Sequence, residues 1–386
     1  MTKAYLILAD GTIFEGQSIG SEGVAVGETV FTTGMTGYLE TLTDPSFYGQ
    51  IVTQTFPLIG NYGVIDEDFE SQKAWARGYI VREVCDKPSN FRCVGALDDF
   101  LKSQGVVGIR GVDTRALTKK LRAFGVMNGM IVSGEKVRSV VHADGVLKCG
   151  PDILSEICGY KIVNAVEAVS RKNESFGRKR IAQGYPEINK NILKFDDKKI
   201  RIVLWDFGAK DNIPRELEKR GVEVVTVPHS YTFDRIKKLS PDGIMLSNGP
   251  GDPADNAAII AEIRKLCDFG KIPMFGICLG HQMLALARGA KTAKLKYGHR
   301  GGNHPVKDTA TGRVYITSQN HGYAVEGGSL PGCATLRFVN ANDGTCEGID
   351  YTDIPAFSVQ FHPEACGGPH DTNFLFDRFL EMIQCH

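Results

Sequence analysis

The stretch Ile272-Pro-Met-Phe-Gly-Ile-Cys278-Leu-Gly280-His-Gln decides the fold. An apolar run typical of a buried strand passes directly into a stretch typical of a helix, and Cys278 at the junction has glycine two residues before and two residues after it. This Gly-x-nucleophile-x-Gly pattern is typical of a nucleophile elbow, with cysteine in place of serine. The glycines leave room where the two backbones crowd, and a helix N-terminus favours the thiolate. We therefore predict that Cys278 is a nucleophile rather than a buried structural cysteine.

The residues on both sides of this stretch alternate between apolar strands and amphipathic helices. Strands are predicted at 200–206, 222–227, 243–247 and 272–277, and helices at 212–220, 255–269, 279–287 and 371–384. Continuous apolar strands that alternate with helices indicate a parallel sheet covered on both faces. We predict an α/β domain at 199–386, with a doubly wound, mostly parallel sheet whose ligand site lies at the carboxyl ends of the strands.

The residues before this domain have a different texture. Residues 1–160 contain short β-type runs separated by Gly, Asp and Pro, and one amphipathic helix is predicted at 114–125, so a strand-rich, mixed α+β domain is expected. Residues 161–198 are polar and weakly periodic, with acidic residues among the basic ones. This composition predicts a solvated connector rather than a basic binding tract.

The overall composition excludes several classes of protein. The chain has 386 residues, 42% of them hydrophobic, and its 45 basic residues balance its 45 acidic residues. A zero net charge argues against a nucleic-acid partner, and no apolar run approaches the ~18–20 residues of a membrane span. The ten cysteines contain no Cys-x-x-Cys pair and the N-terminus does not resemble a signal peptide, so reduced thiols and a cytoplasmic location are expected.

A thiolate nucleophile needs a base, and the base needs an orienting group. The stretch Ala356-Phe-Ser-Val-Gln-Phe-His362-Pro-Glu364 follows the pattern of a late apolar strand. Proline after His362 favours an extended backbone, in which residues two apart project to the same side. Glu364 can then hold the imidazole of His362 in one tautomer, as the carboxylate of a Ser-His-Asp triad does. By itself a His-Pro-Glu sequence is a weak signal, but with the cysteine elbow it predicts a Cys278–His362–Glu364 triad.

A third motif, Leu246-Ser-Asn-Gly249-Pro-Gly251-Asp-Pro-Ala254, follows the third predicted strand. It formally fits a loose dinucleotide fingerprint, but the next strand ends in Cys278 rather than in the acidic residue that would hold a ribose. We interpret it as a tight turn whose backbone N–H groups suit an oxyanion hole. No Gly-Lys-Ser/Thr sequence is present, so a P-loop is absent.

One pair of histidines suggests a metal site at first sight. His299 and His304 are separated by four residues in Tyr297-Gly-His-Arg-Gly-Gly-Asn-His304. The segment is rich in glycine and holds no acidic residue or cysteine, so we predict a loop and no metal.

Together the three motifs SNGPGDP, GICLGHQ and FHPE, in that order, resemble those of the class I glutamine amidotransferases. Earlier segments resemble the small, glutamine-hydrolysing subunits of carbamoyl-phosphate synthase. These segments are Thr36-Gly-Tyr-Leu-Glu-Thr-Leu-Thr-Asp-Pro-Ser46, Gly60-Asn-Tyr-Gly, Ser89-Asn-Phe-Arg, Gly111-Val-Asp-Thr-Arg-Ala-Leu-Thr and Asp206-Phe-Gly-Ala-Lys-Asp-Asn-Ile. The resemblance spans the chain except the connector.

This resemblance implies roles for individual residues. Cys278 corresponds to the nucleophile, His362 to the general base and acid, and Glu364 to the orienting carboxylate, while Gly251 and Leu279 correspond to the backbone oxyanion donors. The positions that match those holding glutamine are Ser46, Gly249, Gly251, Leu279, Gln282, Asn320, Gly322 and Tyr323. Family members often carry Phe where Tyr323 stands, which is a mild departure.

The resemblance also implies a reaction and a partner. Glutamine would be hydrolysed through a γ-glutamyl thioester, and ammonia would pass to a large synthetase subunit in a heterodimer or a higher oligomer. That subunit would make carbamoyl phosphate, for arginine and pyrimidine synthesis, from bicarbonate and two ATP. The resemblance implies no cofactor on this chain, and it places ATP, Mg and bicarbonate on the large subunit. The N-terminal domain, 1–160, would serve as a docking platform.

Two alternatives use the same residues differently. A stand-alone cysteine hydrolase or peptidase would cleave peptides or γ-glutamyl conjugates without a partner. A non-enzymatic assembly or regulatory module would carry a relict site whose thiol titrates like any other.

Overall fold

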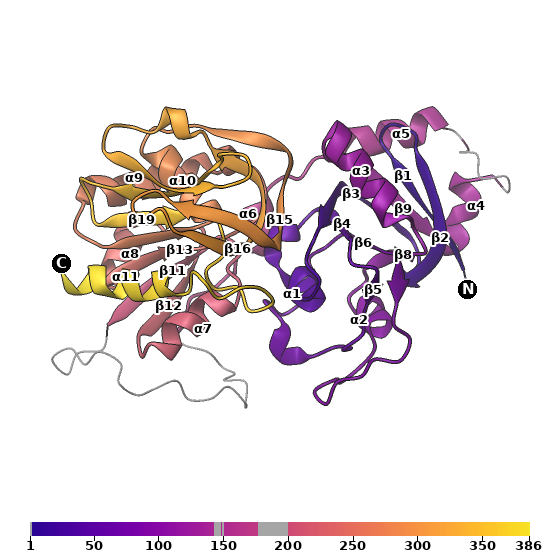
Figure 1. Cartoon of the computed structure of the whole chain (residues 1–386), viewed down its shortest axis with the longest axis horizontal. Coiled ribbons are helices and arrows are strands. Elements are labelled where there is room, and N and C mark those ends of the chain that lie inside the picture. The colour runs from indigo at the N-terminus through magenta and orange to yellow at the C-terminus, as the bar shows by residue number, and fades with distance from the viewer. Residues whose placement is uncertain (1, 143–147, 149, 177–199) are drawn as a thin grey trace. The chain divides into compact units, whose positions relative to one another are not determined.

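The computed structural model describes residues 2–142, 148, 150–176 and 200–386 (Figure 1). The chain divides into two compact units, Met1–Val163 and Asn164–His386. Most of the predicted connector, residues 177–198, lies outside the described residues. No helix in the described ranges is long and apolar enough to cross a membrane. All nine cysteines in these ranges are free thiols.

The first unit is built on a closed barrel with the strand order β1-β2-β8-β6-β4-β3-β9. Its strands are β1 (Lys3–Leu8), β2 (Ile13–Gly20), β3 (Val24–Thr32), β4 (Gln50–Gln54), β6 (Gly78–Val81), β8 (Val107–Arg110) and β9 (Met127–Ser133), with a separate pair β5 (Leu58–Ile59) and β7 (Glu83–Val84). Its helices are α1 (Tyr38–Thr43), α2 (Leu97–Ser103), α3 (Thr114–Phe124), α4 (Val137–Val140) and α5 (Gly150–Gly159). The mixture of parallel and antiparallel pairs confirms a strand-rich α+β unit.

Helix α3 shows how local sequence sets an element of this unit. The carboxylate of Asp113 accepts a hydrogen bond from the N–H of Ala116 at 2.9 Å and so caps the helix N-terminus. Leu117 and Leu121 are fully buried on one face. Gly125 has φ 95°, a conformation that glycine adopts easily, and the helix ends there as the sequence predicts.

The second unit is an α/β unit around one ten-stranded sheet with the order β10-β12-β11-β13-β14-β19-β18-β17-β15-β16. Its strands are β10 (Ser175–Phe176), β11 (Arg201–Asp206), β12 (Glu223–Pro228), β13 (Gly243–Leu246), β14 (Met274–Ile277), β15 (Thr292–Asp308), β16 (Val314–Val325), β17 (Ala334–Asn340), β18 (Cys346–Tyr351) and β19 (Ala356–Val359). Strands β12, β11, β13, β14 and β19 pair in parallel, which confirms the predicted parallel sheet. The last four strands, from β18 to β16, extend it in antiparallel pairs.

Helices cover both faces of this sheet because its parallel strands are apolar on both sides. The helices of the unit are α6 (Ala165–Val169), α7 (Asn212–Lys219), α8 (Phe233–Lys238), α9 (Ala257–Phe269), α10 (Leu279–Ala287) and α11 (Phe374–Gln384). Alternate residues of β11 enter different cores: Leu204 packs in the core that includes α7 and α11, and Trp205 in the core that includes α8, α9 and α10. The doubly wound arrangement predicted from the sequence is therefore present.

One part of the predicted connector belongs to this second unit. Residues 164–176 contribute α6 and the edge strand β10, which pairs with β12. Val166 and Val169 of α6 are buried, so this part is packed rather than solvated. The amphipathic signal of a five-residue helix is too short to stand out within a polar stretch.

Candidate active site

The nucleophile elbow is present at the end of β14. Cys278 links β14 directly to α10, with φ 51° and ψ −102°, a backbone conformation that non-glycine residues rarely adopt. A Cβ atom on Gly280 would lie 2.3 Å from the carbonyl oxygen of Leu246, and one on Gly276 would lie 3.0 Å from the backbone of Gly280. Both glycines are therefore required by the close approach of strand and helix, as the sequence pattern predicts.

The imidazole of His362 is oriented by Glu364. The two side chains are almost completely buried, and Nδ1 of His362 lies 2.7 Å from Oε1 of Glu364. Because a carboxylate accepts, Nδ1 carries the hydrogen and Nε2 is left with its lone pair. Nε2 has no hydrogen-bond partner among the described residues. The ring is therefore held in the tautomer that can take a proton at Nε2.

The sheet brings the cysteine and the histidine to the same edge. Strands β14 and β19 are parallel neighbours with Ile277 opposite Val359, and the N–H of Cys278 donates to the carbonyl of Val359 at 2.9 Å. His362 follows β19 by three residues, and its N–H donates to the carbonyl of Ser318 in β16 at 2.9 Å. Cys278 and His362 therefore both lie beyond the carboxyl ends of adjacent parallel strands, where open α/β sheets bind ligands.

Lys210 joins this arrangement, and our sequence reasoning assigned it no role. Its Nζ lies 3.6 Å from Oε1 of Glu364, and its side chain is nine-tenths buried. Burial by itself would raise the pKa of Glu364, but the charges of His362 and Lys210 outweigh it and hold the pKa below its usual value. Glu364 is therefore an anion that can stabilise an imidazolium. The only sequence feature that could have pointed to Lys210 is its position just beyond the carboxyl end of the predicted apolar strand 200–206.

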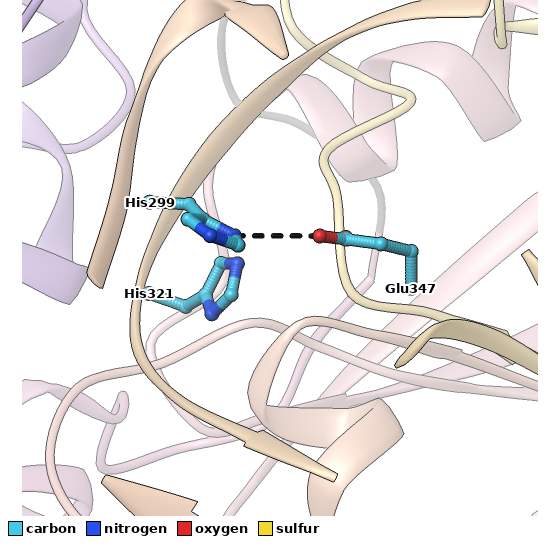
Figure 2. Close-up of side chains that lie close together, drawn as sticks. All are labelled: His299, His321 and Glu347. Carbon is cyan, nitrogen blue, oxygen red and sulfur yellow. Dashed lines mark ion pairs between the residues drawn. The ribbon is translucent and has the colours of Figure 1, made fainter. Parts of the chain in front are cut away.

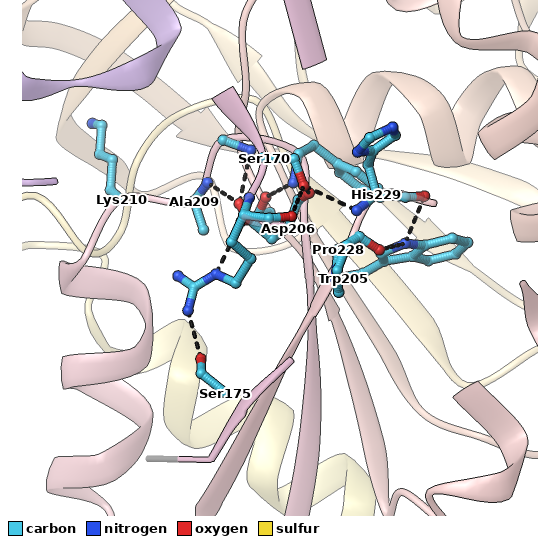
Figure 3. Close-up of polar contacts among 12 residues, drawn as sticks. Ser170, Ser175, Trp205, Asp206, Ala209, Lys210, Pro228 and His229 are labelled. Atoms are coloured by element: carbon cyan, nitrogen blue, oxygen red, sulfur yellow. Dashed lines mark hydrogen bonds and ion pairs between the residues drawn. The ribbon is translucent and has the colours of Figure 1, made fainter. Parts of the chain in front are cut away.

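The turn that carries Lys210 is fixed by Asp206 at the end of β11 (Figure 3). The Oδ1 atom of Asp206 accepts from the N–H groups of Gly208 at 2.9 Å and Ala209 at 2.7 Å. Its Oδ2 atom accepts from the backbone N–H of Arg171 at 2.8 Å and from Nε of Arg171 at 3.0 Å. The buried carboxylate thus ties the segment before β10 to the turn that leads to Lys210.

The turn after β13 packs against the elbow. The N–H of Gly280 donates to the carbonyl of Ser247 at 3.0 Å. A Cβ atom on Gly249 would lie 2.2 Å from the carbonyl oxygen of Phe207 and 2.8 Å from the side chain of Leu279, so the close backbone contact requires this glycine too. Gly251 has φ 89°, which favours glycine. The structure thus brings Gly249 and Leu279 together, and their predicted roles with Gly251 as oxyanion or glutamine contacts stay predictions.

The segment Gln319–Tyr323 lies beside Cys278. The thiol of Cys278 is 3.7 Å from the carbonyl oxygen of Asn320, and Nε2 of Gln282 donates to the carbonyl of Tyr323 at 2.7 Å. The segment, with Gly322 inside it, is part of strand β16. Asn320 and Gln282 are thus gathered around Cys278 with Tyr323, although contact of these residues with glutamine stays a prediction.

Ser46 lies in the other unit. It belongs to a short 3₁₀ helix at Pro45–Phe47, where its N–H donates to the carboxylate of Asp44 at 2.8 Å. Its side chain is nine-tenths buried. A role of Ser46 in holding glutamine stays a prediction.

The prediction of a loop around His299 and His304 is wrong. Both residues lie in the long strand β15, which pairs with β16. The pairing register shifts once between Lys294 and His299 and again between Gly301 and His304. Glycines at Gly298 and Gly301, with φ 71° and 145°, accommodate these irregularities. A glycine-rich strand with bulges has the composition of a loop, which is why the sequence misleads here.

Comparisons with known proteins identify the class to which the chain belongs. The sequence profile "Glutamine amidotransferase class-I" matches residues 203–382, and the profile "Carbamoyl-phosphate synthase small chain, CPSase domain" matches residues 6–131. Among solved structures, a putative GMP synthase protein from Thermoplasma acidophilum has a TM-score of 0.44 and 23% identity, and covers 49% of this chain and 96% of its own.

Relatives match along the whole chain. The carbamoyl phosphate synthase small chain of Bacillus thuringiensis subsp. konkukian is 49% identical over 99% of this chain and 96% of its own length. The small chain of Fusobacterium nucleatum is 48% identical over 99% of both chains, and that of Symbiobacterium thermophilum is 46% identical over 97% of both. The chain is thus an enzyme of the class I glutamine amidotransferase type. It belongs to the carbamoyl phosphate synthase small chain family.

Proposed function

We propose that this chain hydrolyses glutamine to glutamate and ammonia through the Cys278–His362–Glu364 triad and supplies the ammonia to a large synthetase chain. The observation that carries the proposal is the 2.7 Å contact between His362 and Glu364 beside the Cys278 elbow. It prepares Nε2 of His362 to exchange a proton with a nucleophile at the same edge of the sheet. Membership of the family supports glutamine as the substrate.

The first half of the reaction forms a thioester. Nε2 of His362 takes the proton of the Cys278 thiol, and the sulfur attacks the side-chain amide carbon of glutamine. The oxyanion accepts hydrogen bonds from the backbone N–H groups of Leu279 and Gly251, each of which contributes about 3 kcal/mol in sites of this kind. The imidazolium then gives its proton to the leaving nitrogen, so that ammonia departs and the γ-glutamyl group stays on Cys278.

The second half restores the enzyme. His362 accepts a proton from water as the water attacks the thioester carbonyl, and the same donors stabilise the second oxyanion. The carbon–sulfur bond breaks, glutamate leaves, and the proton returns from His362 to the thiolate. Throughout, the Glu364 anion beside Lys210 stabilises the imidazolium and keeps its Nδ1 hydrogen in place.

The ammonia has to be protected from protonation to remain a nucleophile. We propose that it passes to a large subunit that binds ATP, Mg and bicarbonate and forms carbamoyl phosphate for arginine and pyrimidine synthesis, with the first unit as the docking platform. The proposal rests on the match of residues 6–131 to the small-chain profile. Co-purification of a large synthetase chain with the native protein tests it, and a native protein that purifies alone would contradict it.

The glutaminase proposal is tested by glutamate release from glutamine. Cys278→Ser is expected to lower the rate by about 10³-fold or more, because an alcohol is a far poorer nucleophile here than a thiolate. Cys385→Ser, at an exposed thiol of the same unit, is the matched control and is expected to keep full activity. Unchanged release by Cys278→Ser overturns the nucleophile, whereas inert glutamine and cleaved peptides would favour a stand-alone hydrolase.

A further inference from the structure

A second group of histidines and a carboxylate lies in the antiparallel part of the second unit. His299 of β15, His321 of β16 and Glu347 of β18 form what we call the His299 cluster (Figure 2). One nitrogen or oxygen atom of each lies within 4.8 Å of the other two, and all three side chains are at least nine-tenths buried. None of them belongs to the proposed triad.

The hydrogen bonds of His299 leave a lone pair directed at a carboxylate. Its Nε2 lies 2.8 Å from the carboxylate of Asp343, so in the neutral ring Nε2 carries the hydrogen. Its Nδ1 then has only a lone pair, yet it lies 3.4 Å from Oε1 of Glu347 and has no hydrogen-bond partner among the described residues. Two lone pairs that face each other in a buried site repel unless a proton or a metal cation lies between them.

His321 has the same arrangement. Its Nδ1 lies 2.7 Å from the carbonyl of Tyr323, which can only accept, so Nδ1 carries the hydrogen. In the neutral ring, Nε2 then has only a lone pair. Its Nε2 lone pair then faces Oε1 of Gln319 at 2.9 Å, and the contact of Gln319 Nε2 with Thr317 Oγ1 at 3.2 Å keeps that amide oxygen in place. Here too, two acceptors face each other in a buried site.

We propose that the His299 cluster binds a divalent transition-metal ion of the zinc type, through Nδ1 of His299, Nε2 of His321 and the carboxylate of Glu347. Two imidazoles and one carboxylate are a ligand set that such ions prefer. The distance between Nδ1 of His299 and Oε1 of Glu347 is 3.4 Å. Two ligand atoms of a tetrahedral ion with bonds of about 2.0–2.1 Å are expected to lie about 3.3 Å apart, so this distance fits.

The surroundings of the cluster fit this assignment. The ring nitrogen of each histidine that points away from the site is bonded to a carboxylate or a backbone carbonyl, which is the usual outer partner of a metal-bound histidine. Asn340 donates to Oε1 of Glu347 at 3.0 Å, whereas Oε2 has no hydrogen-bond partner among the described residues. Asp343 is half exposed and gives the site an edge that solvent reaches.

A bound ion would fasten β15, β16 and β18 to one another. His321 follows Asn320, whose carbonyl accepts from the Cys278 thiol. The ion would thus stabilise the strand that passes the nucleophile without touching the reacting atoms. A proton on His299 or on Glu347 is the competing explanation. Burial opposes a charge on His299, yet the carboxylates of Glu347 and Asp343 raise its pKa, and burial raises the pKa of Glu347.

Metal analysis separates these explanations without any use of activity. The full chain is stripped with a chelator, mixed with Zn²⁺ or Co²⁺ at pH 8, desalted and measured by mass spectrometry for metal content. We expect a single ion per chain, a rise in melting temperature on loading, and a Co²⁺ spectrum with tetrahedral bands but no thiolate-to-metal charge transfer. A chain that retains neither ion, or that holds Co²⁺ through thiolate, overturns the proposal in favour of a proton held between His299 and Glu347.

Variants locate the ion. Glu347→Gln and His299→Gln are expected to weaken Zn²⁺ binding by 100-fold or more, and Asp343→Ala by about 10- to 100-fold because it acts through His299. His229→Gln, at a half-buried histidine of the same unit outside the cluster, is the control and keeps wild-type affinity. Circular dichroism identifies any variant that fails to fold, and Asp343→Ala, which leaves all three ligands in place, then carries the test. Wild-type affinity in a folded ligand variant contradicts the site.

Discussion

Two histidine–carboxylate groups lie in the same unit and differ in what surrounds them. At the proposed triad, Glu364 accepts a hydrogen bond from Nδ1 of His362, so Nε2 is left with its lone pair at the edge of the sheet that carries the cysteine elbow. At the His299 cluster, two imidazoles and Glu347 converge with no nucleophile among the three. Histidine and glutamate side chains therefore suit proton transfer in one place and metal binding in the other. The difference is that one free nitrogen lone pair is available at the proposed triad, whereas lone pairs of two imidazoles and a carboxylate converge at the His299 cluster.

The largest effect is expected from the base of the triad. His362→Asn removes the group that we propose accepts and returns the proton, and general acid–base catalysis of this kind contributes up to about 10⁴-fold. We expect a loss of about that size in kcat for glutamine hydrolysis, measured as glutamate release. His299→Asn in metal-free protein should lose far less, so equal losses in the two variants would remove the distinction between the two groups.

A smaller loss is expected from the carboxylate. Glu364→Gln keeps a group of the same shape but removes the charge that stabilises the imidazolium, and we expect a drop of about 10²-fold in kcat with little change in KM. Steady-state kinetics measures both constants. A variant with wild-type kcat would show that His362 needs no orienting anion.

Acid stability reports on the same carboxylate. The pKa of Glu364 is held below its ordinary value of 4.5, so its ionised form stabilises the fold above about pH 4.5. That contribution is lost as the pH falls through the lowered pKa of the folded state. Denaturant titrations from pH 7 to pH 3 should show a steeper acid loss for the wild type than for Glu364→Gln. Parallel curves would contradict an ionised Glu364.

Lys210 tests the charge balance of the triad. Lys210→Met leaves the buried anion with one fewer cation, which costs about 3 kcal/mol of unfolding free energy near pH 7. It also raises the pKa of Glu364, so the loss of stability on acidification begins at a higher pH than in the wild type. Equilibrium unfolding at a series of pH values measures both effects. If the variant and the wild type lose stability over the same acidic pH range, Lys210 does not act on Glu364.

The smallest effect on catalysis is expected from Glu347. Glu347→Gln changes the His299 cluster and leaves the three residues of the proposed triad in place. We therefore expect kcat to change by less than about tenfold, and the metal-dependent rise in melting temperature to disappear. Thermal melts with and without Zn²⁺, together with glutamate release, measure both effects. A loss in kcat as large as that of His362→Asn would place the His299 cluster within the catalytic machinery.

The sequence predicts one of these groups far better than the other. The elbow, the parallel strands and the spacing of His362 and Glu364 are local patterns, and strand pairing alone then brings them to one edge. Lys210 and the His299 cluster depend on contacts between distant segments, such as His299 with Glu347. Glycine-rich β15 also has the composition of a loop, so periodicity gave no strand there.

The most direct measurement is the trapping of the acyl intermediate. The full chain is mixed with glutamine, quenched with acid within the first turnover, digested and examined by mass spectrometry. We predict a single γ-glutamyl adduct on the peptide that contains Cys278, absent from Cys278→Ser and retained in Cys385→Ser. An active chain that carries its adduct on another cysteine would contradict it.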